Sequence, residues 1–207
     1  MRNQSGLGRL FILYGIIMAL FTFTLTLSGV TADTEGLVDT LFAAGCDDAL
    51  VCFYGKSVYL EFDREAESLD LAIETAITDI ESTSMNIKVE SIDSTLVGLS
   101  DIAELTGLTR QAVALLKDGA RGKGHFPAPV QRLNGASPLW DWASVAHWLQ
   151  QNNRLVHSPE LYEQAKTLCK WNLVLRNCAN EHVEELQKLT SKLVKQRKQK
   201  RLTEVNR

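Results

Sequence analysis

The fold in the middle of this chain is decided by residues 99–117, which read LSDIAELTGLTRQAVALLK. Small Ala103 lets a second helix cross closely, and Gly107 permits the left-handed backbone of a tight turn. Val113 follows six residues later, where the second helix needs an apolar anchor. Thr109 is a candidate cap for that helix. This spacing predicts a helix-turn-helix made of two short helices.

Each of the two helices is expected to have a buried and an exposed side. The first, from the candidate cap Ser100 to Thr106, should bury Ile102, Ala103 and Leu105. The second should bury Val113 and Leu116, which leaves Arg110, Gln111, Ala114 and Lys117 facing outward. The first turn of a recognition helix reaches base edges in the major groove, where Arg pairs with guanine and Gln with adenine. The alternative is an ordinary helical hairpin with a solvated polar face.

The sequence after the second helix predicts a β-hairpin wing. Residues 119–125 are glycine-rich and basic, and residues 126–133 read FPAPVQRL. Asn134-Gly135 is a strong hairpin-turn signal, after which Leu139 and Trp140 return. Asp141 is a candidate cap for a last helix with Val145, Trp148 and Leu149 inward. We expect the tryptophans at 140, 142 and 148 to be core residues and not a stacking platform.

Residues 97–150 resemble the winged helix-turn-helix of MerR-type regulators and phage excisionases, in which a Phe-Pro-x-Pro-like segment and a Trp flank the wing. The resemblance implies binding of double-stranded DNA. It assigns the recognition helix to Thr109, Arg110, Gln111 and Lys117, and phosphate contacts to Arg121, Lys123, His125 and Arg132. Because the domain usually comes first in those regulators and here follows an acidic module, ligand sensing is not carried over.

Residues 20–95 predict a ferredoxin-like module with the order strand, helix, strand, strand, helix, strand. Alternating Phe and Thr mark a strand over 21–28, and residues 33–35 open a helix that Gly45 ends. Gly55-Lys56 is the turn of a hairpin. The other expected elements are strands over 49–54, 57–62 and 87–92, and a helix over 66–82.

The acidic residues of this module are expected to be structural. Asp63, Glu65, Glu67 and Asp70 cluster where the second helix should begin, and carboxylates there favour the helix dipole. Asp47 and Asp48 are interpreted as a loop and not as a metal site. The alternative is that the acidic module is a docking surface for a basic partner, the chain's own tail included.

Charge is distributed unevenly along the 207 residues, whose net charge is -3. Residues 21–95 carry 15 acidic and 3 basic side chains, residues 96–153 carry 4 and 5, and residues 154–207 carry 6 and 12. Such asymmetry indicates modules with different partners. The acidic mean therefore does not exclude a nucleic-acid binder.

The N-terminus is open to three interpretations. Residues 10–27 carry no charge and just reach the length of a membrane anchor, and Val30-Thr31-Ala32 fits a signal cleavage site. The alternation from Phe21 onward favours a strand instead, and Met18 offers a later start. We expect residues 1–17 to be an upstream extension or a loosely attached tail, and the protein to be cytoplasmic, with a membrane anchor over 10–27 as the alternative.

Residues 154–207 predict helices with a basic end. Ser158-Pro159-Glu160 is a helix start, and Leu161, Ala165, Leu168, Trp171 and Leu175 follow at helical spacing. An interruption is expected at 177–180, after which Val183, Leu186, Leu189 and Leu193 continue an apolar seam. The seam suits a homodimer contact or docking on the first module. Residues 195–201 form a solvated tail or a phosphate-binding arm.

The chain is therefore expected to be α+β, with a 1–19 extension, a 20–95 ferredoxin-like acidic module, a 96–153 winged helix-turn-helix and a 154–207 helical segment. The sequence has no P-loop, dinucleotide fingerprint, nucleophile elbow or metal motif, so we expect no enzyme, no cofactor and no metal. His125 and His147 are interpreted as surface residues, and the four cysteines as reduced thiols. The leading function is a transcriptional regulator or excisionase-like factor that binds double-stranded DNA; the alternative is an antitoxin-like or adaptor protein-interaction module.

Overall fold

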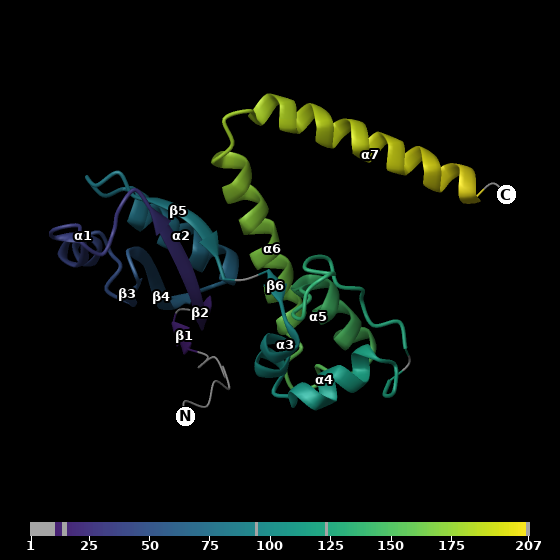
Figure 1. The fold of residues 1–207 in the computed structure, drawn as a ribbon. Helices are drawn as coiled ribbons and strands as arrows, with labels where there is room; N and C mark the ends of the chain where they lie inside the picture. The colour runs from purple at the N-terminus through teal and green to yellow at the C-terminus, as the bar shows by residue number, and fades with distance from the viewer. Residues whose placement is uncertain (1–10, 14–15, 94, 123, 206–207) are drawn as a thin grey trace.

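The computed structural model describes residues 11–13, 16–93, 95–122 and 124–205. Within these ranges the chain is α+β, with one larger antiparallel sheet, one two-stranded sheet and seven helices. Figure 1 shows the larger sheet and α1 on one side, the smaller helical unit on the other, and α6 running between them. The coarse prediction of an α+β chain is confirmed.

The larger sheet is built around the long strand β2 (Ile16–Ser28). One edge of β2 pairs with β4 (Ser57–Ala66), and its other edge pairs with β5 (Lys88–Ile92) and, near its start, with β1 (Phe11–Leu13). β3 (Ala49–Tyr54) pairs with the far edge of β4. All pairs are antiparallel, and the four strands after β1 lie in the order β5-β2-β4-β3.

Helices α1 (Leu37–Ala43) and α2 (Leu69–Glu81) contribute to the core on one face of this sheet. Successive side chains of β2 and β4 point to opposite faces of the sheet, so every second residue faces the helices. Phe23 and Phe62 stack there, with ring centroids 5.2 Å apart. The buried members of this core include Leu25, Leu41, Val58, Leu60, Ile73 and Ile80.

The boundary between β4 and α2 corrects the sequence interpretation. We expected the strand to end at 62 and the helix to begin at 66, but β4 continues to Ala66 and α2 begins at Leu69, where Ser68 accepts a hydrogen bond from the Leu71 N–H. Asp63 and Glu65 therefore lie on the solvent face of a strand. Of the four clustered acids, Asp70 is the one in the first turn of α2.

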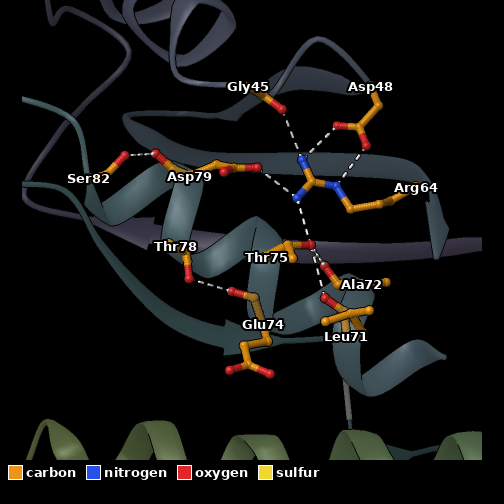
Figure 2. Close-up of polar contacts among 10 residues, drawn as sticks. All are labelled: Gly45, Asp48, Arg64, Leu71, Ala72, Glu74, Thr75, Thr78, Asp79 and Ser82. Atoms are coloured by element: carbon orange, nitrogen blue, oxygen red, sulfur yellow. Dashed lines mark hydrogen bonds and ion pairs between the residues drawn. The ribbon is translucent and has the colours of Figure 1, made fainter. Parts of the chain in front are cut away.

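Arg64 explains why the strand continues. Its side chain points into the core side between the outward Asp63 and Glu65, and only 7% of the residue is exposed. Figure 2 shows its guanidinium held by Asp48 through two hydrogen bonds of 2.7 and 3.0 Å, by Asp79 at 2.8 Å, and by the Gly45 carbonyl at 3.0 Å. The sequence interpretation missed this cluster, which joins the loop after α1 to β4 and α2.

Helix α1 also begins later than expected. Its first residue is Leu37, and its N-cap is Gly36 in the left-handed region at φ 69°. Residues 33–35 therefore precede the helix and do not open it. The hairpin turn at Gly55 is confirmed, since Tyr54 pairs with Ser57 and Gly55 has φ 60°.

The second unit contains α3 (Leu99–Thr106), α4 (Arg110–Lys117) and α5 (Trp142–Gln151). A two-stranded sheet of β6 (Leu96–Val97) and β7 (Trp140–Asp141) ties its start to the entry of α5. These elements share a second core, whose fully buried side chains include Val97, Ile102, Val113, Trp140, Val145 and Leu149.

Helix α6 (Leu161–Cys178) contacts both cores. Its first half places Leu161 and Ala165 in the second core, and its second half places Trp171 and Leu175 in the first. The predicted apolar face of this helix is confirmed. The predicted cap is wrong: α6 begins at Leu161 without a side-chain cap, because Ser158 forms a turn through its carbonyl instead.

Helix α7 (Val183–Val205) follows the expected interruption after Cys178 and runs away from the larger sheet (Figure 1). At the other end of the chain, β2 confirms the strand predicted over 21–28, and the predicted extension over 1–17 lies largely outside the described residues. Across the described helices, none combines the length and apolar character that a membrane crossing requires.

Candidate nucleic-acid interface

The turn between α3 and α4 has the geometry that the sequence predicted. Gly107 ends α3 at φ 67°, in the left-handed region where a side chain would be strained. Thr109 caps α4, since its hydroxyl oxygen accepts a hydrogen bond of 3.1 Å from the Ala112 N–H. The cap of α3 differs from the prediction: Gly98 takes that position, and the Asp101 carboxylate accepts its N–H at 2.7 Å, while Ser100 lies inside the helix.

The buried side of this helix pair agrees with the prediction at four positions and differs at one. Ile102 and Val113 are fully buried, Leu116 is 3% exposed and Ala103 is 8% exposed. Leu105, expected in the core, is 43% exposed. It lies three residues after Ile102, in the last turn of α3.

The outward side of α4 carries the predicted polar residues. Arg110, Gln111 and Lys117 are exposed, and Ala114 is half-buried between them. Arg110 and Gln111 occupy the first turn, directly after the Thr109 cap. Lys117 forms an ion pair with its neighbour Asp118, so part of its charge is compensated locally. A phosphate contact by Lys117 would have to compete with that carboxylate.

Three aromatic side chains hold the segment after α4 against the core. The Trp148 indole N–H donates to the Gly124 carbonyl and the Trp140 indole N–H to the Pro127 carbonyl, both at 3.0 Å. Phe126 lies edge-on to both rings, with centroid distances of 5.0 Å to Trp148 and 6.5 Å to Trp140. Trp142 is 4% exposed. The expectation that these tryptophans belong to the core is confirmed.

The segment predicted to be a wing is a loop with a single bridge, and its turn differs from the prediction. Gln131 and Leu139 form an isolated antiparallel bridge, and two N–H···O bonds between them measure 3.0 and 3.2 Å. A turn closes between the Arg132 carbonyl and the Gly135 N–H, with Leu133 and Asn134 in the centre. Asn134-Gly135 is therefore not a two-residue hairpin turn. Gly135 occupies the last turn position, which glycine also favours, and Arg132 takes the positive φ of 55°.

The remaining predicted DNA contacts lie in this loop region. Arg121 is held near the end of α4, since its N–H donates to the Leu115 carbonyl at 3.1 Å. His125 and Arg132 are both exposed and both have positive φ. Lys123 lies outside the described residues. The structure thus gathers Arg110, Gln111 and Lys117 on one helix, Arg121 just beyond its end, and Arg132 at the wing turn.

The His, Cys and acidic side chains of the described residues are the side-chain types that could bind a metal ion. No group of three His, Cys, Asp or Glu side chains within those residues is placed to hold a metal ion. The four cysteines are free, and burial, with Asp79 nearby, raises the pKa of the Cys46 thiol to about 11. His147, expected at the surface, is exposed and packs its ring 4.9 Å from Tyr162.

One further polar residue escaped the sequence interpretation. Asn172 is 7% exposed, and its side-chain amide accepts a hydrogen bond from the Ile92 N–H at 3.1 Å and donates one to the Ile92 carbonyl at 2.6 Å. Its position between Leu168 and Leu175, on the apolar face of the helix, was the available signal.

No family model, no curated protein and no solved structure matches this chain.

Proposed function

We propose that this chain binds double-stranded DNA in a sequence-specific manner, with α4 as the recognition helix, and acts as a transcriptional regulator or an excisionase-like accessory factor. The observation that carries the proposal is the first turn of α4. There, Arg110 and Gln111 project to solvent from a capped helix end whose opposite side is fixed in the core by Val113. A rigid helix that presents Arg and Gln in its first turn suits base readout in the major groove. The proposal includes no catalytic step and a cytoplasmic location.

Two finer fold descriptions belong to this proposal. The antiparallel order β5-β2-β4-β3 supports a ferredoxin-like description of the first module. The α3–α4 turn, with the 130–139 loop and α5 after it, supports a winged helix-turn-helix description of the second. In that arrangement Arg121, Lys123, His125 and Arg132 touch phosphate, which positions the helix without reading sequence.

The test begins with a DNA site selected from a random pool by the full chain. Arg110→Ala and Gln111→Ala should each weaken binding to that site by about 1–3 kcal/mol and relax the preference for one base pair. Arg154→Ala and Gln151→Ala are matched controls, because both residues are exposed, Gln151 as the last residue of α5 and Arg154 just beyond it. Fluorescence polarisation at fixed salt measures the affinity. If both α4 variants bound like the parent, α4 would not be the recognition helix.

A second candidate function is protein–protein interaction, in which the chain binds a basic partner. The observation favouring it is the solvent face of the larger sheet, where Glu61, Asp63 and Glu65 of β4 are all exposed. If the full chain recovered no preferred DNA sequence and its retention on DNA vanished at moderate salt, this second function would be favoured.

A further inference from the structure

The larger sheet has one face that α1 and α2 leave open and that α6 borders on the β5 side. Helices α1, α2 and α6 all contribute to the core on the other face. On the open face, β2 presents Thr22, Thr24, Thr26 and Ser28, and β4 presents Tyr59, Glu61, Asp63 and Glu65. The pairing register sets Glu61 opposite Thr24 and Asp63 opposite Thr22. We call this surface the acidic sheet face.

Two basic residues, Lys88 opposite Ser28 and Arg176 of α6, lie on the β5 side of the acidic sheet face, and among the described residues neither forms an ion pair with Glu61, Asp63 or Glu65. Asp63 accepts a hydrogen bond from the Thr22 hydroxyl at 2.7 Å, and Glu90 of β5 accepts one from Ser28. These bonds orient the carboxylates without neutralising them. Arg64, which lies between Asp63 and Glu65 in sequence, is turned to the opposite face. The face also exposes apolar surface, since Leu50 of β3 is 61% exposed and Tyr54 is 83% exposed.

Helix α7 has the complementary composition. Leu186, Leu189 and Leu193 follow at spacings of three and four and are 36%, 51% and 48% exposed. Lys188, Lys192 and Lys195 follow at spacings of four and three, roughly a third of the way round the helix from the leucines. At 23 residues, α7 is about 34 Å long, which matches the span of about 33 Å of the ten-residue β4.

Local hydrogen bonds direct α7 away from the acidic sheet face of its own chain. The Ala179 N–H donates to the Leu175 carbonyl at 3.0 Å, and the Asn180 N–H to the Asn177 carbonyl at 3.2 Å. The Asn180 side chain then accepts the His182 N–H at 2.7 Å. Figure 1 shows the result, with α7 leaving α6 and running away from the sheet. Docking on the same chain would have to break this turn, whereas docking on a second copy would not.

We propose that α7 of one copy binds the acidic sheet face of a second copy, and that two copies exchange these helices reciprocally. The leucines of α7 then cover Leu50 and Tyr54, and its lysines face Glu61, Asp63 and Glu65. This inference names the basic partner of the sheet as a second copy of this chain. It does not depend on DNA binding by α4.

The test uses two full-length charge-reversed variants. The face-reversed variant carries Glu61→Lys and Glu65→Lys, which leaves the Asp63–Thr22 bond in place. The helix-reversed variant carries Lys192→Glu and Lys195→Glu. Each should weaken self-association by about tenfold or more in sedimentation experiments, because like charges then face each other across the interface. A variant with Asp39→Lys and Glu74→Lys, exposed positions on α1 and α2, is the matched control and should associate like the parent.

Mixing the two reversed variants is the decisive measurement. A mixed pair has one parental contact and one contact with both charges reversed, so heterodimers should form where each variant alone is monomeric. A monomeric parent, or a face-reversed variant that dimerises like the parent, would overturn the proposal. So would a helix-reversed variant that stays dimeric and loses only DNA affinity, since α7 would then be a phosphate-binding arm. Circular dichroism checks that each variant is folded.

Discussion

Arg64 is a charged side chain on the core side of a strand, and every nitrogen of its guanidinium has a partner. Burial by itself would lower the pKa of this guanidinium, but the hydrogen bonds that it donates to Asp48 and Asp79 outweigh burial and raise the pKa above its ordinary value. The side chain is therefore charged at neutral pH, as an arginine ordinarily is. The guanidinium lies over the Phe62 ring, with its central carbon 5.0 Å from the ring centre. The ion cluster thus replaces apolar packing at the junction of α1, β4 and α2.

Replacing Arg64 should be among the more damaging single changes in the first core. Arg64→Ala leaves Asp48 and Asp79 facing each other without a cation, and we expect a loss of about 2–4 kcal/mol in the free energy of unfolding. Their carboxylates remain 28% and 30% exposed, which lets water offset part of the cost. Urea-induced unfolding measures the effect.

The control is an ion pair of the same kind at the surface. Lys56 and Asp33 lie 3.2 Å apart with side chains 83% and 73% exposed, so Lys56→Ala should change stability by about 0.5 kcal/mol or less. Equal losses for the two variants would show that the Arg64 cluster contributes no more than a surface pair.

At the scale of an element, the Asn172 side chain attaches α6 to the sheet. It makes the two backbone hydrogen bonds that a neighbouring strand would otherwise make. The Asn172 amide satisfies both the N–H and the C=O of Ile92, the last residue of β5, and also donates to the Leu168 carbonyl at 3.0 Å. Asp70 of α2 adds a second attachment by accepting a hydrogen bond from the Trp171 indole at 2.8 Å and pairing with Lys170. The hydrogen bond from Lys170 is the largest cause that lowers the pKa of the Asp70 carboxyl, ahead of the one from Trp171.

Asn172→Leu should therefore destabilise the protein although leucine is the more apolar residue. It leaves the buried N–H and C=O of Ile92 without partners, at a cost of about 1–3 kcal/mol in the free energy of unfolding. Asn177→Leu, five residues later on the same helix, is the matched control and should be nearly neutral. Denaturant unfolding of both variants measures the difference in stability. An unchanged midpoint for Asn172→Leu would mean that the hydrogen bonds of Asn172 add nothing to stability.

At the scale of the whole molecule, two cores share one helix. Leu175 is 8% exposed in the first core and Ala165 is 1% exposed in the second, and both lie on α6. If either core unfolded, about half of the buried side chains of α6 would become exposed to solvent. Because α6 belongs to both cores, the two units have a physical reason to unfold together. The short connection between β5 and β6 is a second, covalent link between them.

Hydrogen exchange can test this coupling. In the parent chain, the slowest amides of β4 in the first core and of α5 in the second should exchange with the same opening free energy, as one cooperative unit. In Asn172→Leu, where α6 is loosened from the sheet, the two values should separate. Different opening energies in the parent would instead indicate two independent units.

Local patterns in the sequence determined much of this molecule. Strict alternation of Phe and Thr predicted β2, and the Ala103, Gly107 and Val113 spacing predicted α3, the turn and α4, because period and turn chemistry act within a few residues. The caps of α4 and α5 at Thr109 and Asp141 were also predictable, since a capping side chain reaches only two or three residues along the chain.

Tertiary structure alone decided the features that join distant residues. β4 continues to Ala66 with Arg64 facing the core, where the guanidinium forms ion pairs with Asp48 and Asp79, 16 and 15 residues away in the sequence. Asn172 pairs with Ile92 across 80 residues, and the turn of the 130–139 loop centres on Leu133 and Asn134, one residue before the predicted Asn-Gly turn. A sequence pattern reports which side chains need partners, but only the folded chain supplies those partners, since loop closure brings together groups that no local period connects.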